Sequence, residues 1–153
     1  MYSDILVAYD KSDQSRHALA EALHLAEQCD TKVTLLYVSD VSDVDSVVDK
    51  AKAVVDQEEG VSENAGVEAQ REYYESQRQA IEQDVADIIA GADNVRVLAT
   101  SGKAADAILE LCETEHFDML VMGARKLGFF ESILGSVSSA VLKESKIPVL
   151  IVK

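Results

Sequence analysis

The chain has 153 residues, 48% of them hydrophobic and 27% charged, a composition that fits one folded domain and excludes a disordered chain. Its net charge is −14, which excludes a nucleic-acid-binding surface because phosphate contacts need clustered Lys and Arg. No apolar stretch reaches the ~20 residues that span a bilayer, so we expect no membrane segment.

The acidic residues are concentrated in one part of the chain. Residues 40–93 carry 15 of the 28 acidic residues and 4 of the 14 basic ones, whereas residues 94–153 carry 7 of each. Such a face keeps a protein soluble, and an acidic coat is also an adaptation to a salt-rich cytoplasm. Both interpretations stay open at this point.

The cysteines and the N-terminal residues predict the compartment. Cys29 and Cys112 are too few for a disulfide framework and are typical of small buried side chains in a reducing compartment. The first strand-like run begins by Ile5, which leaves no room for a signal segment. We therefore expect a cytoplasmic protein.

Strands and helices alternate along the chain. Each predicted strand is a short apolar run of the kind that is buried on both faces of a parallel sheet. These runs are residues 5–9, 33–38, 95–99, 119–122 and 149–152. The first helix is capped by Ser12 or Asp13, and later helices are expected over residues 103–115 and from Ser136 to Glu144.

The acidic segment adds an excursion, residues 40–68, to this alternation. Val44 to Val55 fit one helix face, residues 58–66 predict a loop, and a longer helix then carries Tyr74 and Ile88 and ends at Gly91. The whole chain, residues 1–153, is expected to form one domain.

Strands separated by helices force a parallel sheet with right-handed crossovers. The predicted fold class is α/β: an open five-stranded parallel sheet, doubly wound and Rossmann-like, with helices on both faces and strand order 3-2-1-4-5. The third strand is partly alternating, which suits a sheet edge. The last strand is wholly apolar and ends the chain, so we expect an edge strand that pairs across a homodimer through Val149, Leu150, Ile151 and Val152.

Candidate ligand-binding residues follow the first and fourth strands, because ligands bind beyond the carboxyl ends of parallel strands. Tyr9 and Asp10 end the first strand, and the Asp10 carboxylate can accept hydrogen bonds from a ribose or a base. Gly135 and Ser136 open the last helix, whose first-turn N–H groups can hold a phosphate. Arg125 and Lys126 add positive charge. Ordinary caps and turns would explain each residue alone, so the prediction depends on their convergence.

Three C-terminal segments, residues 121–125, 135–138 and 148–152, resemble the C-terminal half of universal stress proteins. Residues 5–12 resemble the opening strand of that family, and residues 102–108 resemble its third-helix entry. The resemblance implies a five-stranded parallel sheet, dimerisation through the last strand, and either an ATP-binding or a non-binding branch.

The ATP-binding branch carries Gly, two residues, Gly, nine residues, then Gly-Ser or Gly-Thr. Gly123 matches the first glycine and Gly135-Ser136 the final pair, whereas Lys126 replaces the second glycine and the spacer is one residue short. Gly128 would compensate by shifting the turn, and Lys126 would either narrow the cradle or supply charge to the phosphates. The resemblance further places Asp10 at the nucleotide, the backbone of Ala8, Val38 and Met122 near adenine, and Val137 and Ser138 on the phosphate side.

The sequence lacks the residues that other phosphate-binding, metal-binding and catalytic motifs require. Gly102-Lys103 has neither the earlier glycine nor the following Ser or Thr of a P-loop, no GxGxxG follows the first strand, and a receiver domain would need an aspartate after the third strand. His17 and His24 have no third ligand partner for zinc, and neither cysteine neighbours a base.

The resulting hypothesis is a regulatory stress-response protein that binds an adenine nucleotide as a homodimer. The nucleotide is ATP, ADP or AMP, with Mg as an accompanying ion. No catalytic residue and no membrane or nucleic-acid partner are expected. A slow ATPase and a dimeric scaffold with an empty pocket remain as alternatives.

Overall fold

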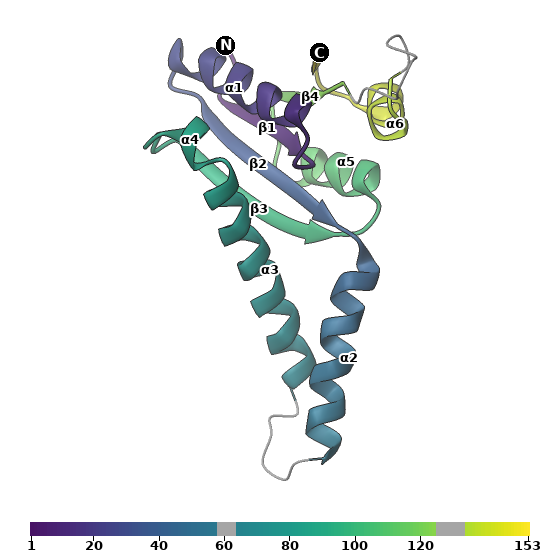
Figure 1. The fold of residues 1–153 in the computed structure, drawn as a ribbon. Helices are drawn as coiled ribbons and strands as arrows, with labels where there is room; N and C mark the ends of the chain where they lie inside the picture. Colours follow the sequence, from purple (N-terminus) through teal and green to yellow (C-terminus); the bar gives the residue numbers. More distant parts are fainter. Residues whose placement is uncertain (58–63, 125–133) are drawn as a thin grey trace.

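The five predicted strands form one parallel sheet in the computed structural model, which describes residues 1–57, 64–124 and 134–153 (Figure 1). The strand order is β3-β2-β1-β4-β5, which confirms the predicted order. The strands are β1 (Asp4–Tyr9), β2 (Lys32–Ser39), β3 (Val95–Ser101), β4 (Met119–Gly123) and β5 (Val149–Val152). All four neighbouring pairs are parallel.

Strand β1 lies at the centre of the sheet and is buried on both faces. Val7 is paired with Leu35 of β2 on one side and with Val121 of β4 on the other. Leu6 and Val7 point to opposite faces, and neither is exposed to solvent. A continuous apolar run therefore forms this strand because helices cover both faces of the sheet.

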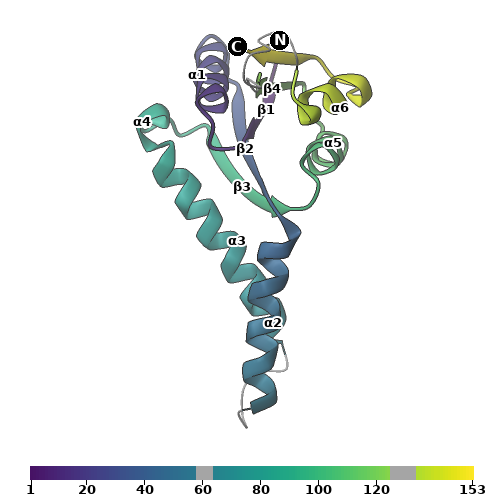
Figure 2. The ribbon, with the colours of Figure 1, turned by 45° about the vertical axis from the view of Figure 1, so that its right-hand side comes forward.

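The helices form a layer on each face of the sheet (Figures 1 and 2). One layer contains α1, the end of α3, and α4, and it packs on Val7, Leu35 and Val97. The other contains α5 and α6, and it packs on Leu6 and Leu36. The helices are α1 (Asp13–Glu27), α2 (Val41–Gln57), α3 (Ala65–Asp84), α4 (Ala86–Ile89), α5 (Ala104–Thr114) and α6 (Ser136–Glu144).

Helices α2 and α3 pack against each other and extend away from the sheet as an arm (Figures 1 and 2). The predicted loop over residues 58–66 is wrong at its end, because Ala65 and Gly66 already belong to α3. Gly66 lies close to α2: a Cβ at this position would be 3.3 Å from Cγ1 of Val48. Residues 58–63 lie outside the described part of the chain.

The long helix expected to run to Gly91 is divided into two. Val85 has φ −105° and ψ 7°, so α3 ends at Asp84 and the short α4 follows. Ala90 ends α4 with a left-handed conformation at φ 41°, and Gly91 follows at φ 84°. The predicted stop signal at Gly91 is thus confirmed, whereas the break at Val85 has no Gly or Pro to announce it.

The first helix has one of its two predicted caps, and both cysteines are free. Ser12 is the N-cap of α1, and its hydroxyl accepts a hydrogen bond from the N–H of Ser15 at 3.2 Å. Cys29 and Cys112 are free thiols that are partly rather than fully buried. Within the described residues, no helix has the length and apolarity needed to cross a membrane.

Candidate functional site

A cavity lies beyond the carboxyl ends of β1 and β4, where the strand order reverses. It is bounded by the sheet, the start of α1, α5 and the start of α6. Ten of the thirteen predicted site residues are lining residues of this cavity. The lining comprises Ala8, Tyr9, Asp10, Ser15, Leu36, Val38, Ala104, Ile108, Met122, Gly123, Gly135, Ser136, Val137 and Ser138.

One wall of the cavity is apolar. Ala8, Leu36 and Met122 come from three adjacent strands and belong to the core on the α5–α6 face, where Ile108 of α5 packs against them. Val38 extends the same wall at the end of β2. These side chains form a surface that fits a flat, weakly polar ring.

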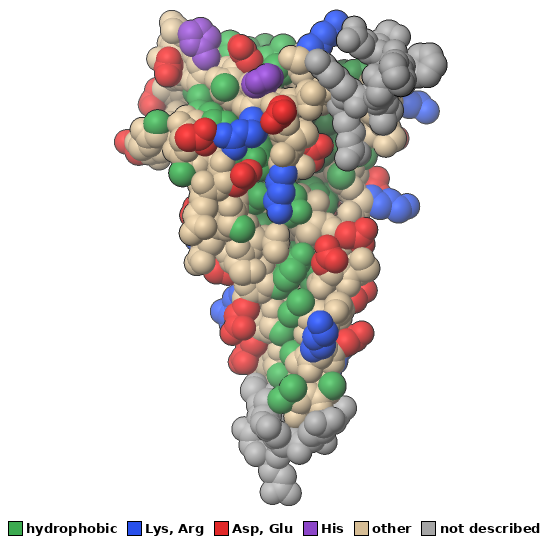
Figure 3. Space-filling view, in the orientation of Figure 1, with side chains coloured by type: hydrophobic (Ala, Val, Ile, Leu, Met, Phe, Trp, Pro, Cys, Tyr) green, Lys and Arg blue, Asp and Glu red, His purple; other side chains and the backbone are tan. Residues whose placement is uncertain are grey.

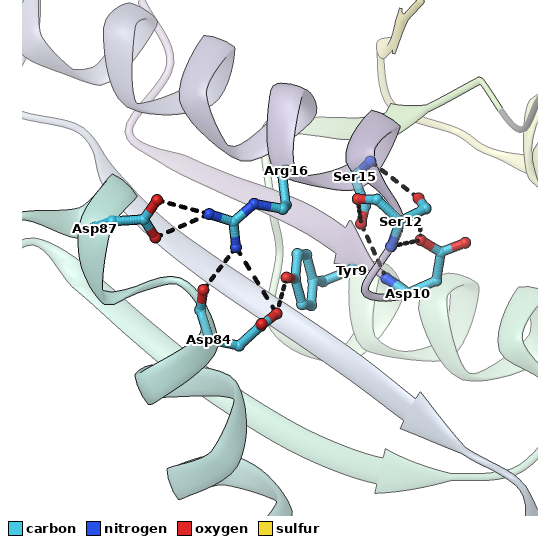
Figure 4. Close-up of polar contacts among 7 residues, drawn as sticks. All are labelled: Tyr9, Asp10, Ser12, Ser15, Arg16, Asp84 and Asp87. Carbon is cyan, nitrogen blue, oxygen red and sulfur yellow. Dashed lines mark hydrogen bonds and ion pairs between the residues drawn. The ribbon is translucent and has the colours of Figure 1, made fainter.

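Asp10 lies at the end of β1 and is held by the first turn of α1 (Figure 4). Its Oδ1 atom accepts hydrogen bonds from the backbone N–H of Ser12 at 3.0 Å and from the Ser12 hydroxyl. Its own backbone N–H donates to Oγ of Ser15 at 3.3 Å, and this hydroxyl donates to the carbonyl of Ser12 at 2.9 Å. The carboxylate is therefore in a fixed position at the cavity.

Ser15 is a lining residue that the sequence analysis missed. Its side chain is buried, and it supports the backbone of Asp10 rather than ending a helix. The spacing Ser12-x-x-Ser15 is the available signal, because a serine one turn after an N-cap faces the same side of the helix.

The start of α6 forms the polar end of the cavity. Gly135 precedes the helix with φ −61° and ψ 160°, and the N–H of Ser139 donates to its carbonyl at 2.9 Å. The N–H groups of Ser136, Val137 and Ser138 precede this bond and have no intrahelical acceptor. Within the described residues, no side chain caps them. Aligned N–H groups at a helix N-terminus attract an anion.

Gly123 has a packing role that does not depend on a ligand. A Cβ at this position would lie 2.5 Å from the carbonyl carbon of Gln14 and 2.7 Å from its oxygen, and both atoms belong to the backbone of α1. The first turn of α1 can approach the end of β4 because residue 123 has no side chain. Gly123 therefore permits a close approach between two elements.

The ring of Tyr9 points to the other face of the sheet, although Tyr9 is a lining residue. Its hydroxyl donates to a carboxylate oxygen of Asp84 at the end of α3 (Figure 4). Burial, reinforced by the Asp84 carboxylate, raises the pKa of Tyr9 to about 12. The phenol therefore stays protonated at neutral pH.

Arg16 joins the same group from α1 (Figure 4). Its guanidinium donates to the carbonyl of Asp84 at 2.6 Å and to both carboxylate oxygens of Asp87, at 2.7 and 2.9 Å. This pairing lowers the pKa of Asp87 below its usual range. The helix whose first turn holds Asp10 is thereby connected to the junction between α3 and α4, a link that the sequence did not predict.

Three predicted site residues, Arg125, Lys126 and Gly128, lie outside the described part of the chain. Among the described residues, no group of three or more His, Cys, Asp and Glu side chains could hold a metal ion. Asp10 is the one carboxylate in the described cavity lining.

The fold and the position of this cavity define a doubly wound, Rossmann-like α/β protein with its cavity at the topological switch point. The chain matches the model of the universal stress protein family over residues 1–153 and therefore belongs to this family. Universal stress protein MJ0531 of Methanocaldococcus jannaschii is 30% identical to it over 154 residues, which cover 100% of this chain and 83% of the relative.

Solved structures with the same fold include hypothetical protein MJ0577, with a TM-score of 0.68 and 26% identity over 100% of this chain and 96% of that one. A universal stress protein in complex with cAMP has a TM-score of 0.62 and 24% identity, and the match covers 99% of this chain and 96% of that protein.

Proposed function

We propose that the chain is a regulatory universal stress protein whose cavity binds an adenine nucleotide. The observation that carries the proposal is the pairing, in one cavity, of an apolar wall with a helix N-terminus. A purine base binds against an apolar surface, and a phosphate binds at the N–H groups of a helix N-terminus. A structural relative of this chain was solved with cAMP, which contains both groups.

The apolar wall is the proposed adenine site. Leu36 and Met122 would contact the face of the ring, and the backbone groups of Ala8, Val38 and Met122 would supply hydrogen bonds to its edge. In this arrangement an aromatic base would contact side chains that are already largely buried, so that its binding would bury apolar surface at little polar cost.

Asp10 is the proposed ribose contact. Ser12 and Ser15 already fix its backbone and one carboxylate oxygen, so that little further ordering is needed when a hydroxyl donates to the carboxylate. Tyr9 contributes its backbone to this part of the cavity, because its ring lies on the opposite face of the sheet.

The start of α6 is the proposed phosphate site. Gly135, Ser136, Val137 and Ser138 would bind the phosphate closest to the ribose through backbone N–H groups. The cavity chemistry fits AMP, ADP and ATP alike, and Gly123, Arg125, Lys126 and Gly128 remain the proposed neighbours of any further phosphates. A Mg ion would accompany ATP and offset phosphate charge, held mainly by the nucleotide because Asp10 is the single carboxylate in the described lining.

The most informative experiment is mild denaturation of the purified protein followed by chromatography of the released small molecules. Released AMP, ADP or ATP in near-stoichiometric amount is the expected result. An empty protein that also shows no thermal shift with millimolar ATP and magnesium would contradict the proposal and favour a dimeric scaffold.

A Gly135→Val variant tests the phosphate site separately. The backbone angles of Gly135 are ones that valine adopts readily, so the fold should be retained. The side chain would crowd the phosphate position, and we expect nucleotide affinity to fall at least about tenfold, or 1.4 kcal/mol. A Gly135→Val protein with unchanged circular dichroism and unchanged affinity would remove α6 from the site.

A further inference from the structure

One segment of the chain contacts both the candidate nucleotide cavity and the base of the α2–α3 arm. It runs from Tyr9 at the end of β1 to Arg16 in the first turns of α1. Tyr9, Asp10 and Ser15 of this segment line the cavity. The side chains of Tyr9 and Arg16 also bind the end of α3 (Figure 4). A displacement of this segment at the cavity would therefore displace groups that hold the arm.

The cavity side of this segment contains a strained turn. Lys11 has φ 66°, a left-handed conformation that is unfavourable for a residue with a side chain. The Asp10 carboxylate holds the turn in this conformation, because it accepts hydrogen bonds from the N–H of Ser12 at 3.0 Å and from the Ser12 hydroxyl. Asp10 is also the proposed ribose contact. Because a nucleotide would contact Asp10 only in this position, its binding would stabilise the turn.

The arm side of the segment is formed by Tyr9 and Arg16. The Tyr9 hydroxyl donates to the Asp84 carboxylate. The Arg16 guanidinium donates to the Asp84 carbonyl at 2.6 Å and to both carboxylate oxygens of Asp87 at 2.7 and 2.9 Å. These acceptors lie on either side of Val85, where α3 ends and α4 begins. The two side chains therefore bridge the break between the two helices.

The arm has little buried surface with which to hold itself on the sheet. Among its described side chains, Val44 of α2 and Ile81 of α3 alone are buried, and Figure 3 shows acidic and hydrophobic side chains exposed along the arm. The hydroxyl of Tyr74 adds a hydrogen bond to the hydroxyl of Ser101 at the end of β3, at 2.7 Å. An element with few buried apolar contacts opens locally at a small cost in free energy. The hydrogen bonds at Asp84 are therefore important for how firmly the end of α3 is docked.

The two sides of the segment are joined directly. Ser15 and Arg16 are consecutive residues of α1, so the hydroxyl that supports Asp10 and the guanidinium that binds the end of α3 belong to one helical turn. Tyr9 makes the same connection in the strand, because its backbone lines the cavity and its ring lies on the opposite face of the sheet. Ordering of the segment from one side therefore lowers the entropy that is lost when bonds form on the other side.

We propose that a nucleotide in the cavity strengthens the docking of α3 and α4 on the body of the protein through Tyr9 and Arg16, so that the stability of the base of the arm depends on whether the cavity is filled. This inference rests on the proposed function, because the adenine nucleotide is the effector. By linkage, the contacts at the junction between α3 and α4 raise nucleotide affinity by the same factor by which the nucleotide strengthens them. Arg16 therefore acts on affinity without lining the cavity.

Arg16→Gln tests the link from the arm side. We expect AMP affinity, measured by calorimetry, to fall at least about fivefold, the lower end of common coupling factors. Arg78→Gln is the matched control, because Arg78 lies on α3 and also pairs with two carboxylates, those of Glu75 and Glu82, but does not contact α1. It should leave AMP affinity unchanged. Equal AMP affinity in Arg16→Gln and the original protein would overturn the proposal.

Hydrogen–deuterium exchange with and without saturating AMP tests the link from the cavity side. The reporters are four backbone N–H groups that donate to carbonyls of residues 81–86, namely those of Val85, Ile88, Ile89 and Ala90. AMP should slow their exchange at least about fivefold in the original protein and in Arg78→Gln. It should not do so in a Tyr9→Phe/Arg16→Gln variant saturated with AMP. Unchanged exchange at these amides in the AMP-saturated original protein would overturn the proposal.

A measurement without nucleotide separates this link from the proposed function. Absence of AMP binding to the original protein would overturn the proposed function, and Ser12→Ala then decides the link alone. Loss of the hydroxyl that holds Asp10 should speed exchange at the four reporter amides at least about threefold. Ser42→Ala is the control, because the Ser42 hydroxyl makes the same bond to Asp40 at the start of α2. Equal exchange in Ser12→Ala and Ser42→Ala would overturn the link between the cavity and the arm.

Discussion

Gly123 shows how one missing side chain positions two elements. Its Cβ would overlap the backbone of Gln14, so Gly123→Ala must push the start of α1 away from β4. We expect the free energy of unfolding to fall by about 1–3 kcal/mol, the usual cost of overpacking. Urea unfolding followed by circular dichroism measures the change.

Gly66→Ala is the matched control for this substitution. Its Cβ would be 3.1 Å from Cε of Lys52 and 3.3 Å from Cγ1 of Val48, which are side-chain atoms that can shift, and alanine favours a helix over glycine by about 1 kcal/mol. The stability of Gly66→Ala should therefore be unchanged or higher. Equal losses in both variants would show that the close approach at Gly123 is not what the glycine provides.

Tyr9 predicts a specific response to alkaline pH. Its pKa is about 12 in the folded protein and about 10 in an unfolded chain. Between these values the unfolded chain has lost the phenol proton and the folded protein has kept it, so stability falls as pH rises from 10 to 12. The stabilisation that Tyr9 contributes is fully present below pH 10.

Tyr9→Phe isolates this contribution. The variant lacks the titrating hydroxyl, so its free energy of unfolding should fall less steeply than that of the original protein between pH 10 and 12. Denaturant unfolding at several pH values measures both slopes. Parallel slopes would mean that Tyr9 does not hold its proton against Asp84 in solution.

The residue types in the sequence predicted which positions meet at the cavity but not how their side chains are used. Asp10, Gly135 and Ser136 follow strand ends or precede a helix, so topology alone brings them together. The face to which the Tyr9 ring points depends on strand parity and on Asp84, 75 residues away. Contacts over such a separation leave no local pattern in the chain.

At the scale of elements, β5 forms the end of the sheet that lies next to β4. The N–H of Leu120 donates to the carbonyl of Pro148, and that of Ala124 donates to the carbonyl of Val152. Because backbone groups alternate sides along a parallel strand, those of Val149 and Ile151 face outward. These two residues are the proposed backbone contacts of the homodimer.

Val149→Pro tests this dimer edge. Proline removes the outward N–H and adds a ring at the edge, whereas edge strands tolerate it in the monomer. We expect the dimer dissociation constant to rise at least about tenfold in sedimentation equilibrium, with Val149→Thr unchanged because it retains the N–H. A Val149→Pro protein that stays dimeric would place the interface elsewhere.

The boundaries of helices and strands were predictable where the chain carries a residue that marks a boundary. Ser136 to Glu144 and residues 149–152 match α6 and β5 at both ends, since a serine opens the helix and Pro148 precedes the strand. The division of α3 from α4 at Val85 was not predictable. Val85 is fully buried and lies beside the Arg16 contact to Asp84, so tertiary packing determines this break.

At the scale of the whole molecule, three surfaces are separated along one sheet. The proposed dimer edge is at β5, the proposed nucleotide cavity lies between β4 and β1, and the arm covers β3. Arg16 and Tyr9 connect the β1–α1 junction beside the cavity to the base of the arm. In this order, the proposed dimer edge and the proposed nucleotide cavity do not overlap.

The most direct test of the nucleotide site is an NMR titration of the isotope-labelled protein with AMP. The account predicts that the largest amide shifts fall on Ser136, Val137 and Ser138, with further shifts at Asp10 and Val38, and that adenosine leaves the three α6 amides nearly unmoved. Saturating AMP and ATP without shifts at these amides, or with the largest shifts on another face, would contradict it.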